Sequence, residues 1–224
     1  MVLFVTRKGN ERRILLDVKD YIITEADVLF GQYGFKSVTM DDIAKHLGIS
    51  KKTIYLHFAD KDELVTELLE GKLNNHSNCL VTNFEQAHDA VHEVFLGITQ
   101  INDWLNTLNA KLFYDLQKYH PKAWLKFKKF KEQHLTKGVI TNLNRGIKEG
   151  LYRENLNIDI IAQIRLDHGN IIFNQHDQYM MNKYSMDEVM KEVTYHFLYG
   201  ICSKEGIIRI NEYKERLSSN KLNK

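Results

Sequence analysis

Residues that interrupt helices are scarce in this 224-residue sequence, which has one proline and 12 glycines. A β-sandwich or β-barrel needs many turns, so this scarcity favours a helical protein. The two cysteines, Cys79 and Cys202, lie far apart and lack metal-ligand spacing. A disulfide or zinc framework is therefore not expected, and the composition fits the reducing cytoplasm.

Long apolar runs and an excess of one charge are also missing. No run approaches the roughly 18 apolar residues of a membrane span, so no membrane association is predicted. The first residues, MVLFVTRKGNERR, place their charges after a very short apolar stretch, which is the wrong order for a signal peptide. The formal net charge is only +2, so any contact with a polyanion must come from locally placed basic groups.

Helical spacing of apolar residues runs through most of the chain and predicts an all-α fold. We expect an irregular N-terminal extension over residues 1–19, a compact three-helix domain over 20–65 and a helical-bundle domain over 66–224. The first helix is expected from Asp20 to Gly34, where glycine provides a stop. Helices of the bundle are predicted over 85–102, 103–119, 121–150, 157–181 and 185–206.

Residues 39–64 predict two short helices, a tight turn between them and the start of a long helix. Capping residues occur at each start: Thr39 with Asp42, Ser50, and Asp60 with Glu63. Gly48 allows the positive φ that the turn requires. The apolar positions lie on one side and predict a small core: Ile43, Leu47, Ile49, Ile54 and Phe58.

The opposite face of the second short helix carries hydroxyl, basic and aromatic side chains: Ser50, Lys51, Lys52, Thr53, Tyr55 and His57. A helix about 10–12 Å across fits the DNA major groove, and these side chains can reach base edges and phosphates. Backbone N–H groups at Thr39, Met40 and Lys61 begin helices, where the dipole favours a phosphate. The pattern alone equally suits an ordinary pair of helices with solvated lysines.

The segment VTMDDIAKHLGISKKTIYLHFADKDELV closely resembles the N-terminal DNA-binding domain of the TetR family of bacterial regulators. The motifs T-hydrophobic-x-x-I-A, G-hydrophobic-S, T-hydrophobic-Y-x-H-F and K-x-x-L occur in the family's order and spacing. The preceding ADVLFGQYGFKSV resembles the family's first helix, so the match covers residues 21–68. Residues 1–19 depart from the family, whose members usually begin only a few residues before that helix.

The resemblance implies a DNA-binding transcriptional regulator, usually a repressor, and neither an enzyme nor a cofactor-binding protein. Double-stranded operator DNA is the expected partner. The resemblance implies base or near-base contacts for Lys51, Lys52, Thr53 and His57, and phosphate contacts for Thr39, Tyr55 and Lys61.

The resemblance also implies a helical C-terminal body that dimerises through its last two long helices and often binds a small molecule. Here those helices fall within residues 157–206, and a two-fold homodimer would place its recognition helices about 34 Å apart on a palindromic site. Candidates for an effector pocket are aromatic and histidine residues, although aromatic residues at helical spacing more often form a core. They are His88, His92, Phe95, Trp104, Phe113, Tyr114, Trp124 and Phe127.

Other interpretations stay open from the sequence. His88 and His92 have metal-compatible spacing, but that signal is weak and no metal site is predicted. The basic residues within 7–13 suit either a minor-groove arm or an unstructured tail. The rival to a regulator is a helical-bundle enzyme or an interaction module without DNA-binding activity. No nucleophile elbow, P-loop or HExxH motif supports the enzyme.

Overall fold

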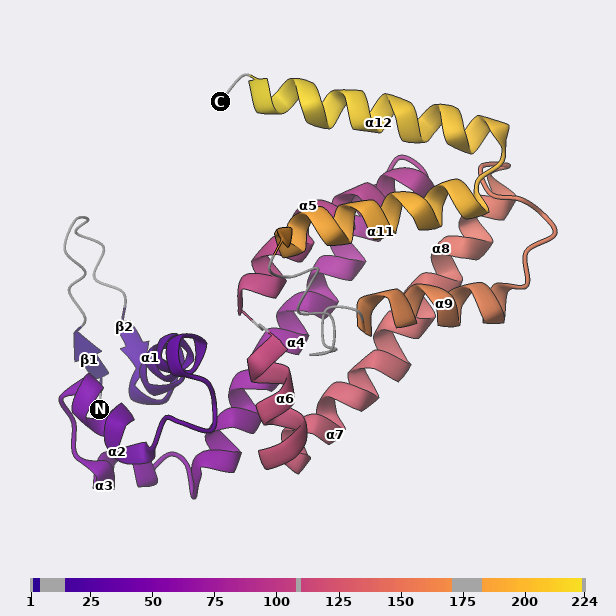
Figure 1. The fold of residues 1–224 in the computed structure, drawn as a ribbon. Helices are drawn as coiled ribbons and strands as arrows, with labels where there is room; N and C mark the ends of the chain where they lie inside the picture. The colour runs from indigo at the N-terminus through magenta and orange to yellow at the C-terminus, as the bar shows by residue number, and fades with distance from the viewer. Residues whose placement is uncertain (1, 5–14, 108–109, 171–182, 223–224) are drawn as a thin grey trace. The chain divides into compact units, whose positions relative to one another are not determined.

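The computed structural model describes residues 2–4, 15–107, 110–170 and 183–222, which are almost entirely helical (Figure 1). The elements are β1 (Val2–Phe4), β2 (Leu15–Asp17), α1 (Val18–Tyr33), α2 (Met40–Leu47), α3 (Lys51–Tyr55), α4 (Lys61–Gln86), α5 (Ala90–Thr107), α6 (Ala110–Tyr119), α7 (Pro121–Phe130), the π-helical turn η1 (Lys131–Leu135), α8 (Thr136–Lys148), α9 (Ile158–Asn170), α11 (Met186–Ile201) and α12 (Lys204–Leu222). The all-α class is confirmed, with one two-stranded ladder added to it. No helix among these residues is long and apolar enough to cross a membrane.

The N-terminal region contains regular structure that helical periodicity did not reveal. Val2–Phe4 pairs antiparallel with Leu15–Asp17. Helix α1 begins at Val18, two positions before the predicted start, because Val18 is buried one turn ahead of Ile22. The expected irregular extension over 1–19 is therefore wrong for these segments. The basic residues within 7–13 lie outside the described residues.

The chain forms two compact units. One comprises Met1–Leu73 with Lys111–Phe127, and the other comprises Asn74–Ala110 with Lys128–Lys224. Residues 111–127 thus belong with the N-terminal helices, although the sequence placed everything after residue 65 in the second domain. Non-local contacts explain this assignment, such as the 2.9 Å hydrogen bond that the Lys36 amide donates to Asp115 of α6.

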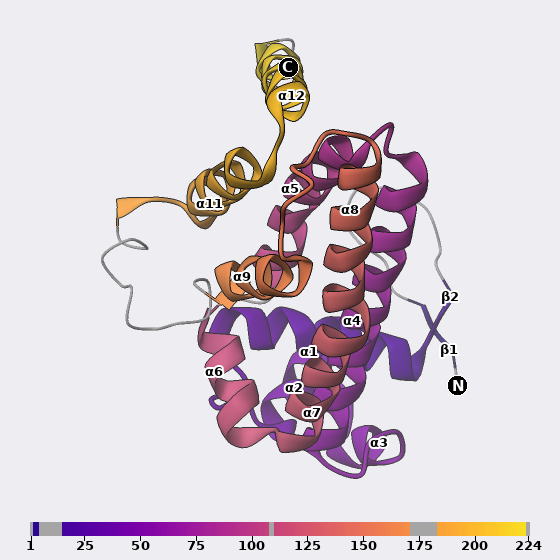
Figure 2. The same ribbon diagram turned by 90° about the vertical axis from the view of Figure 1, so that its right-hand side faces the viewer.

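The second unit packs α5, α8, α9 and α11 around an apolar core. Helix α9 lies against α8, and α5 contacts both α8 and α11 (Figure 2). Tyr152 lies at the centre of this core and is 1% exposed. The Tyr152 hydroxyl lies 3.1 Å from the Ala90 carbonyl and 3.0 Å from Asn142 Oδ1. A Cβ at Gly146 would lie 2.1 Å from the Tyr152 ring, so the ring packs directly on the α8 backbone.

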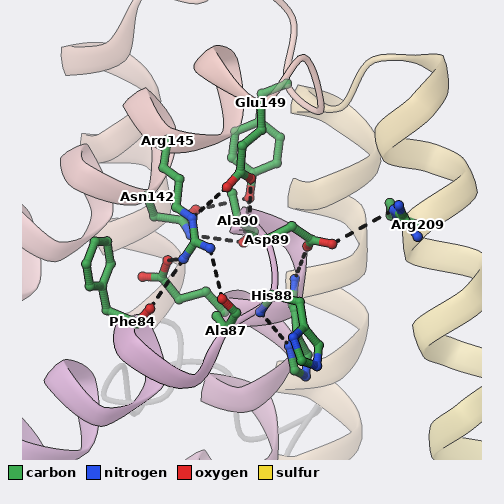
Figure 3. Close-up of polar contacts among 12 residues, drawn as sticks. Phe84, Ala87, His88, Asp89, Ala90, Asn142, Arg145, Glu149 and Arg209 are labelled. Carbon is green, nitrogen blue, oxygen red and sulfur yellow. Dashed lines mark hydrogen bonds and ion pairs between the residues drawn. The ribbon is translucent and has the colours of Figure 1, made fainter.

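A polar network joins the start of α5 to the end of α8 (Figure 3). Arg145 Nε donates to Glu149 at 2.7 Å, and its Nη2 donates to the Ala87 carbonyl at 2.9 Å. Arg145 Nη1 also reaches Glu93 at 3.3 Å. Glu149 in turn accepts from the Ala90 amide at 2.7 Å. The network therefore satisfies main-chain groups at helix ends that have no partner within their own helix.

Several helix boundaries differ from those predicted. Helix α5 begins later than the prediction over 85–102, at Ala90, and runs on to Thr107; α6 covers the rest of the prediction over 103–119, and residues 108–109 lie outside the described residues. The helix predicted over 121–150 is observed as α7, η1 and α8 in succession. Of the helix predicted over 157–181, the structure describes α9, and residues 171–182 lie outside the described residues.

The helix predicted to end near Gly206 is in fact two helices. Helix α11 ends at Ile201 and α12 begins at Lys204. The amide of Ser203, between them, donates to the Leu151 carbonyl at 2.9 Å. A Cβ at Gly206 would lie 2.0 Å from that same carbonyl oxygen, so glycine permits the close approach. The break depends on this non-local pairing, which helical periodicity does not reveal.

Replacing Tyr152 with Phe should lower the free energy of unfolding by about 1–3 kcal/mol, because Asn142 and the Ala90 carbonyl lose a buried partner. Urea unfolding followed by circular dichroism measures this loss. Tyr199→Phe is the matched control, because it removes an exposed hydroxyl that donates to Asn211. A change below about 0.5 kcal/mol is expected for the control. Equal losses in the two variants would contradict the role given to Tyr152.

Candidate nucleic-acid interface

Helices α2 and α3 both begin at side-chain caps. Thr39 Oγ1 accepts from the Asp42 amide at 3.2 Å, and the Asp42 carboxylate accepts from the Thr39 amide at 2.9 Å. Ser50 Oγ accepts from the Thr53 amide at 3.1 Å. Gly48, with φ of 66°, provides the left-handed turn between the helices. These predicted caps and the turn are confirmed.

A small core sets the orientation of α3. Ile43 and Ile54 are fully buried, and Phe58 is 1% exposed. Leu47 and Ile49, which were predicted for the same core, are half-buried. Helix α3 has only five residues, which is too short for a helix to be stable without tertiary contacts. Burial of Ile54 and Phe58 therefore fixes which side chains α3 turns outward.

Lys51, Lys52 and Tyr55 are exposed on the outward side of α3. Lys51 donates to Asp41 at 3.0 Å, and this hydrogen bond raises the pKa of the lysine. Lys52 has no carboxylate partner among the described residues. Tyr55 is 45% exposed, with Lys51 Nζ 6.0 Å from its ring centroid. The three side chains present two cations and a phenol on one surface, which suits phosphate and base contacts.

The other residues predicted on this face of α3 lie closer to the protein. Ser50 Oγ and Thr53 Oγ1 are 2.9 Å apart, so both hydroxyls are engaged at the helix start. Thr53 and His57 are half-buried. They therefore offer less surface to a partner than Lys51, Lys52 and Tyr55 do.

The starts of α2 and α4 offer mainly main-chain donors. The Thr39 hydroxyl donates to Asp42 at 2.6 Å, and the Met40 side chain is only 6% exposed, which leaves its amide for any contact. Lys61, the first residue of α4, is half-buried. Burial lowers the pKa of Lys61, while the charge of Asp115 acts in the opposite direction.

Four aspartates in this region, Asp41, Asp42, Asp60 and Asp62, balance the positive charge of the lysines, and all four make contacts within the protein. Asp42 caps α2, and Asp60 caps α4 by accepting from the Glu63 amide at 2.8 Å. Asp62 lies 3.1 Å from His120 Nδ1 and 3.8 Å from Lys122 Nζ. Asp41 alone of the four faces the exposed lysines, through Lys51.

Two buried polar residues in this unit were not identified from the sequence. Asp115 and His120 are 4% and 5% exposed, and burial lowers the pKa of His120. Asp115 accepts from the Lys36 amide, and the His120 ring lies 5.6 Å from the Phe35 ring. Together they tie α6 and the start of α7 to the segment after α1. Asp115 lies on the same helix face as the apolar Leu112. A carboxylate at a position where the helical spacing expects an apolar residue was the sequence signal that could have identified Asp115 as buried.

The residues predicted for an effector pocket divide between the two units. Those in the first unit are Phe113, Tyr114, Trp124 and Phe127; those in the second are His88, His92 and Phe95; the Trp104 side chain lies outside the described residues. The Phe113 and Phe127 rings meet edge-on at 5.0 Å. The eight residues therefore do not belong to a single unit.

The two histidines of the predicted pocket stack on each other. The His88 and His92 rings are 4.8 Å apart, and His92 stacks on Tyr213 of α12 at 4.9 Å. Within the described parts of the chain, no group of three or more His, Cys, Asp or Glu side chains converges as a metal site would. The histidine pair thus takes part in packing between α5 and α12.

Comparison with known proteins identifies the domain that these helices form. Residues 22–68 match the family described as bacterial regulatory proteins, tetR family. The chain is 25% identical over 185 residues to the uncharacterized HTH-type transcriptional regulator YvaF of Bacillus subtilis, covering 82% of this chain and 95% of that protein. It is 24% identical over 145 residues to the HTH-type transcriptional repressor KstR2 of Mycobacterium tuberculosis, covering 63% and 72%.

Solved structures share the fold. The structure of KstR2 matches with a TM-score of 0.59 at 19% identity, over 85% of this chain and 98% of that one. A putative transcriptional regulator from Saccharomonospora viridis, solved in complex with choline, matches with a TM-score of 0.66 at 20% identity, over 83% and 98%. The matched region runs from α1 into α4 and contains the helix-turn-helix. The chain therefore belongs to the tetR family of bacterial regulatory proteins and is a DNA-binding transcriptional regulator.

Proposed function

We propose that this protein is a cytoplasmic homodimeric repressor that binds a palindromic operator and is released from it by a small-molecule effector. Residues 20–65 bind the DNA, and residues 66–224 dimerise and bind the effector. Helix α3 enters the major groove, with Lys51, Lys52, Thr53 and His57 toward bases. Thr39, Tyr55, Lys61 and the Met40 amide hold phosphates, and Ser50 holds the start of α3.

The exposed face of α3 carries the proposal. Lys51, Lys52 and Tyr55 project from a helix whose opposite side is anchored by Ile54. Lysine and tyrosine are donors to phosphate oxygens, and lysine also pairs with the O6 and N7 acceptors of guanine. A surface that only needed to be soluble would not require this combination on a helix with a fixed orientation.

The ion pair between Lys51 and Asp41 is compatible with this role. Both side chains are about half exposed, at 47% and 55%, so the pair contributes little to stability. Lys51 can therefore exchange the Asp41 carboxylate for a phosphate or guanine acceptor at small cost. In the free protein the pair keeps the lysine close to the surface that meets DNA.

An exposed apolar stripe on α9 supports the homodimer. Ile160 is 57% exposed and Ile164 is 41% exposed, one turn apart on the same side of the helix. Ala162, on the other side, is 2% exposed and belongs to the core. Exposed apolar side chains gathered on one face favour burial against another chain. The interface proposed over residues 157–206 includes this stripe.

Small-molecule binding by a structural neighbour supports the effector. The Saccharomonospora viridis regulator with this fold was solved in complex with choline. In this chain the second unit has an apolar core of its own, in which Phe95 is 3% exposed. An effector that binds better to the form unable to bind DNA would shift the population away from the operator.

Substitutions on α3 should separate base contacts from phosphate contacts. Lys52→Ala is expected to weaken operator binding by about 1–3 kcal/mol and to relax the preference at one base pair. Tyr55→Phe is expected to weaken binding to all sequences alike, because it removes a phosphate contact. Fluorescence anisotropy with operator and single-base-pair variants, repeated at several salt concentrations, measures both effects.

Lys137→Ala is the matched control, since Lys137 is an exposed lysine of α8 in the other unit. It should leave both the affinity and the base preference unchanged. If Lys52→Ala behaves like Lys137→Ala, or if the parent binds every duplex equally, specific readout by α3 is refuted.

Charges placed on the α9 stripe should break the dimer. Light scattering of the parent is expected to give twice the chain mass of 26.3 kDa. Ile160→Glu with Ile164→Glu should give the mass of one chain, because two carboxylates cannot be buried without partners. Val81→Glu, at a 56% exposed position of α4, is the control and should stay dimeric. A monomeric parent would exclude the homodimer.

A further inference from the structure

Helix α9 carries two basic side chains, Arg165 and His168, between its inward and outward sides. Ala162, at 2% exposed, marks the side that packs into the second unit. Arg165 follows Ala162 by three residues, whereas His168 follows the exposed Ile164 by four and lies at the edge of the exposed side. Both side chains are half-buried.

Both side chains converge on one aromatic ring of α11. Arg165 Cζ lies 5.3 Å from the centroid of the Phe197 ring, and Phe197 is 6% exposed. The His168 ring stands edge-on to the same ring, with the centroids 6.1 Å apart. Phe197 thus brings the guanidinium and the imidazole to one place in the unit.

Among the described residues, neither basic group has a polar partner that satisfies it. His168 Nδ1 is buried and has no hydrogen-bond partner in this part of the chain. Arg165 forms no ion pair or hydrogen bond with any residue that the structure describes. Its contact with Phe197 is a cation–π interaction, which offsets only part of the cost of removing a charge from water.

Both side chains are half-buried, and partial burial shifts their pKa values. Burial lowers the pKa of Arg165 to about 10, with Tyr152 opposing the shift. Burial also lowers the pKa of His168; Arg165 and His196 lower it further, and Asp167 opposes them. Arginine at this pKa is still a cation near neutral pH, so Arg165 is a half-buried positive charge that no described carboxylate pairs with.

Two other arginines of the described chain, Arg145 and Arg209, are paired with carboxylates. Arg145 lies 3.3 Å from Glu93 and 2.7 Å from Glu149, and Arg209 lies 2.9 Å from Glu212. A buried arginine without a carboxylate is destabilising, since desolvation is not repaid by an opposite charge. Arg165 is therefore arranged as one half of an ion pair whose other half is not among the described residues.

We propose that Arg165 and His168 form an anion subsite for a small organic acid. The guanidinium pairs with the carboxylate or phosphate of the ligand, and His168 Nδ1–H donates to it. The apolar part of the ligand packs on Phe197 and the adjoining core. The inference deepens the proposed function, because it assigns the effector to the class of organic anions with an apolar body.

The test measures binding directly and without DNA. The probes are hexanoate, octanoate, benzoate and phenylacetate, each compared with its neutral amide, and hexyl phosphate to separate phosphate from carboxylate. Thermal shift and isothermal titration calorimetry on the full chain are the readouts. At least one anion should stabilise the parent, and its amide should bind about tenfold or more weakly, as expected for a charge-assisted hydrogen bond.

Two arginine substitutions make the test specific. Arg165→Met keeps an apolar side chain of similar length, so the variant should fold at least as stably as the parent without ligand and lose the preference for acid over amide. Arg216→Met is the matched control, because Arg216 is exposed and its Cζ lies 5.5 Å from the Tyr213 ring. The control should bind like the parent.

Any of four results would overturn the subsite. The first two are that no anion stabilises the protein, or that acid and amide bind equally well. The third is that Arg165→Met and Arg216→Met lose the preference for acid over amide to the same extent. The fourth is that the Arg165→Met variant is monomeric, which would indicate that Arg165 forms an ion pair with a second subunit. The proposed function is assessed separately, by adding the same probe to the protein–DNA complex. If an anion binds but does not release DNA, the subsite stands and its regulatory role is excluded. If the protein binds DNA but no anion, the subsite is excluded and the DNA-binding function stands.

Discussion

Burial of Ile54 is the constraint on which the proposed DNA-binding surface of α3 depends. Helix α3 has five residues, and Ile54 is its one buried side chain. A helix of this length gains too few internal hydrogen bonds to offset its loss of conformational entropy. Its direction is therefore set by Ile54, by Phe58 just beyond it and by the Ser50 cap. Lys51, Lys52 and Tyr55 face outward because Ile54 faces inward.

The placement of charge matters more than its amount. The formal net charge of +2 gives no indication of a polyanion partner. In the structure, however, Asp42 and Asp60 are used as helix caps and Asp62 faces His120. These carboxylates are therefore engaged in contacts within the protein, whereas the lysines of α3 remain exposed. A near-neutral chain thereby presents a local basic surface.

Features set by neighbouring residues could be predicted from the sequence. The caps at Thr39 and Ser50 follow from hydroxyls placed just before helical periodicity begins, and Gly48 adopts the expected left-handed turn. The exposed side of α3 followed from the apolar side, because a helix has a fixed period.

Features set by non-local contacts could not be predicted. The break between α11 and α12 depends on Ser203 pairing with Leu151, far away in the sequence. Asp115 lies in α6, whose spacing looks apolar, and His120 lies between α6 and α7; their partners come from α4 and the segment after α1. Arg165 was not identified from the sequence, because only packing against α11 brings it to Phe197.

Selection of binding sequences from random duplex DNA by the full-length protein tests the central claim most directly. If a dimer presents two copies of α3, the enriched sequences should form a palindrome with half-sites about one or two helical turns apart, in steps of about 34 Å. Enrichment should also fall as salt rises if lysines contact phosphates as proposed. Recovery of sequences without a shared motif would contradict the claim that α3 reads DNA.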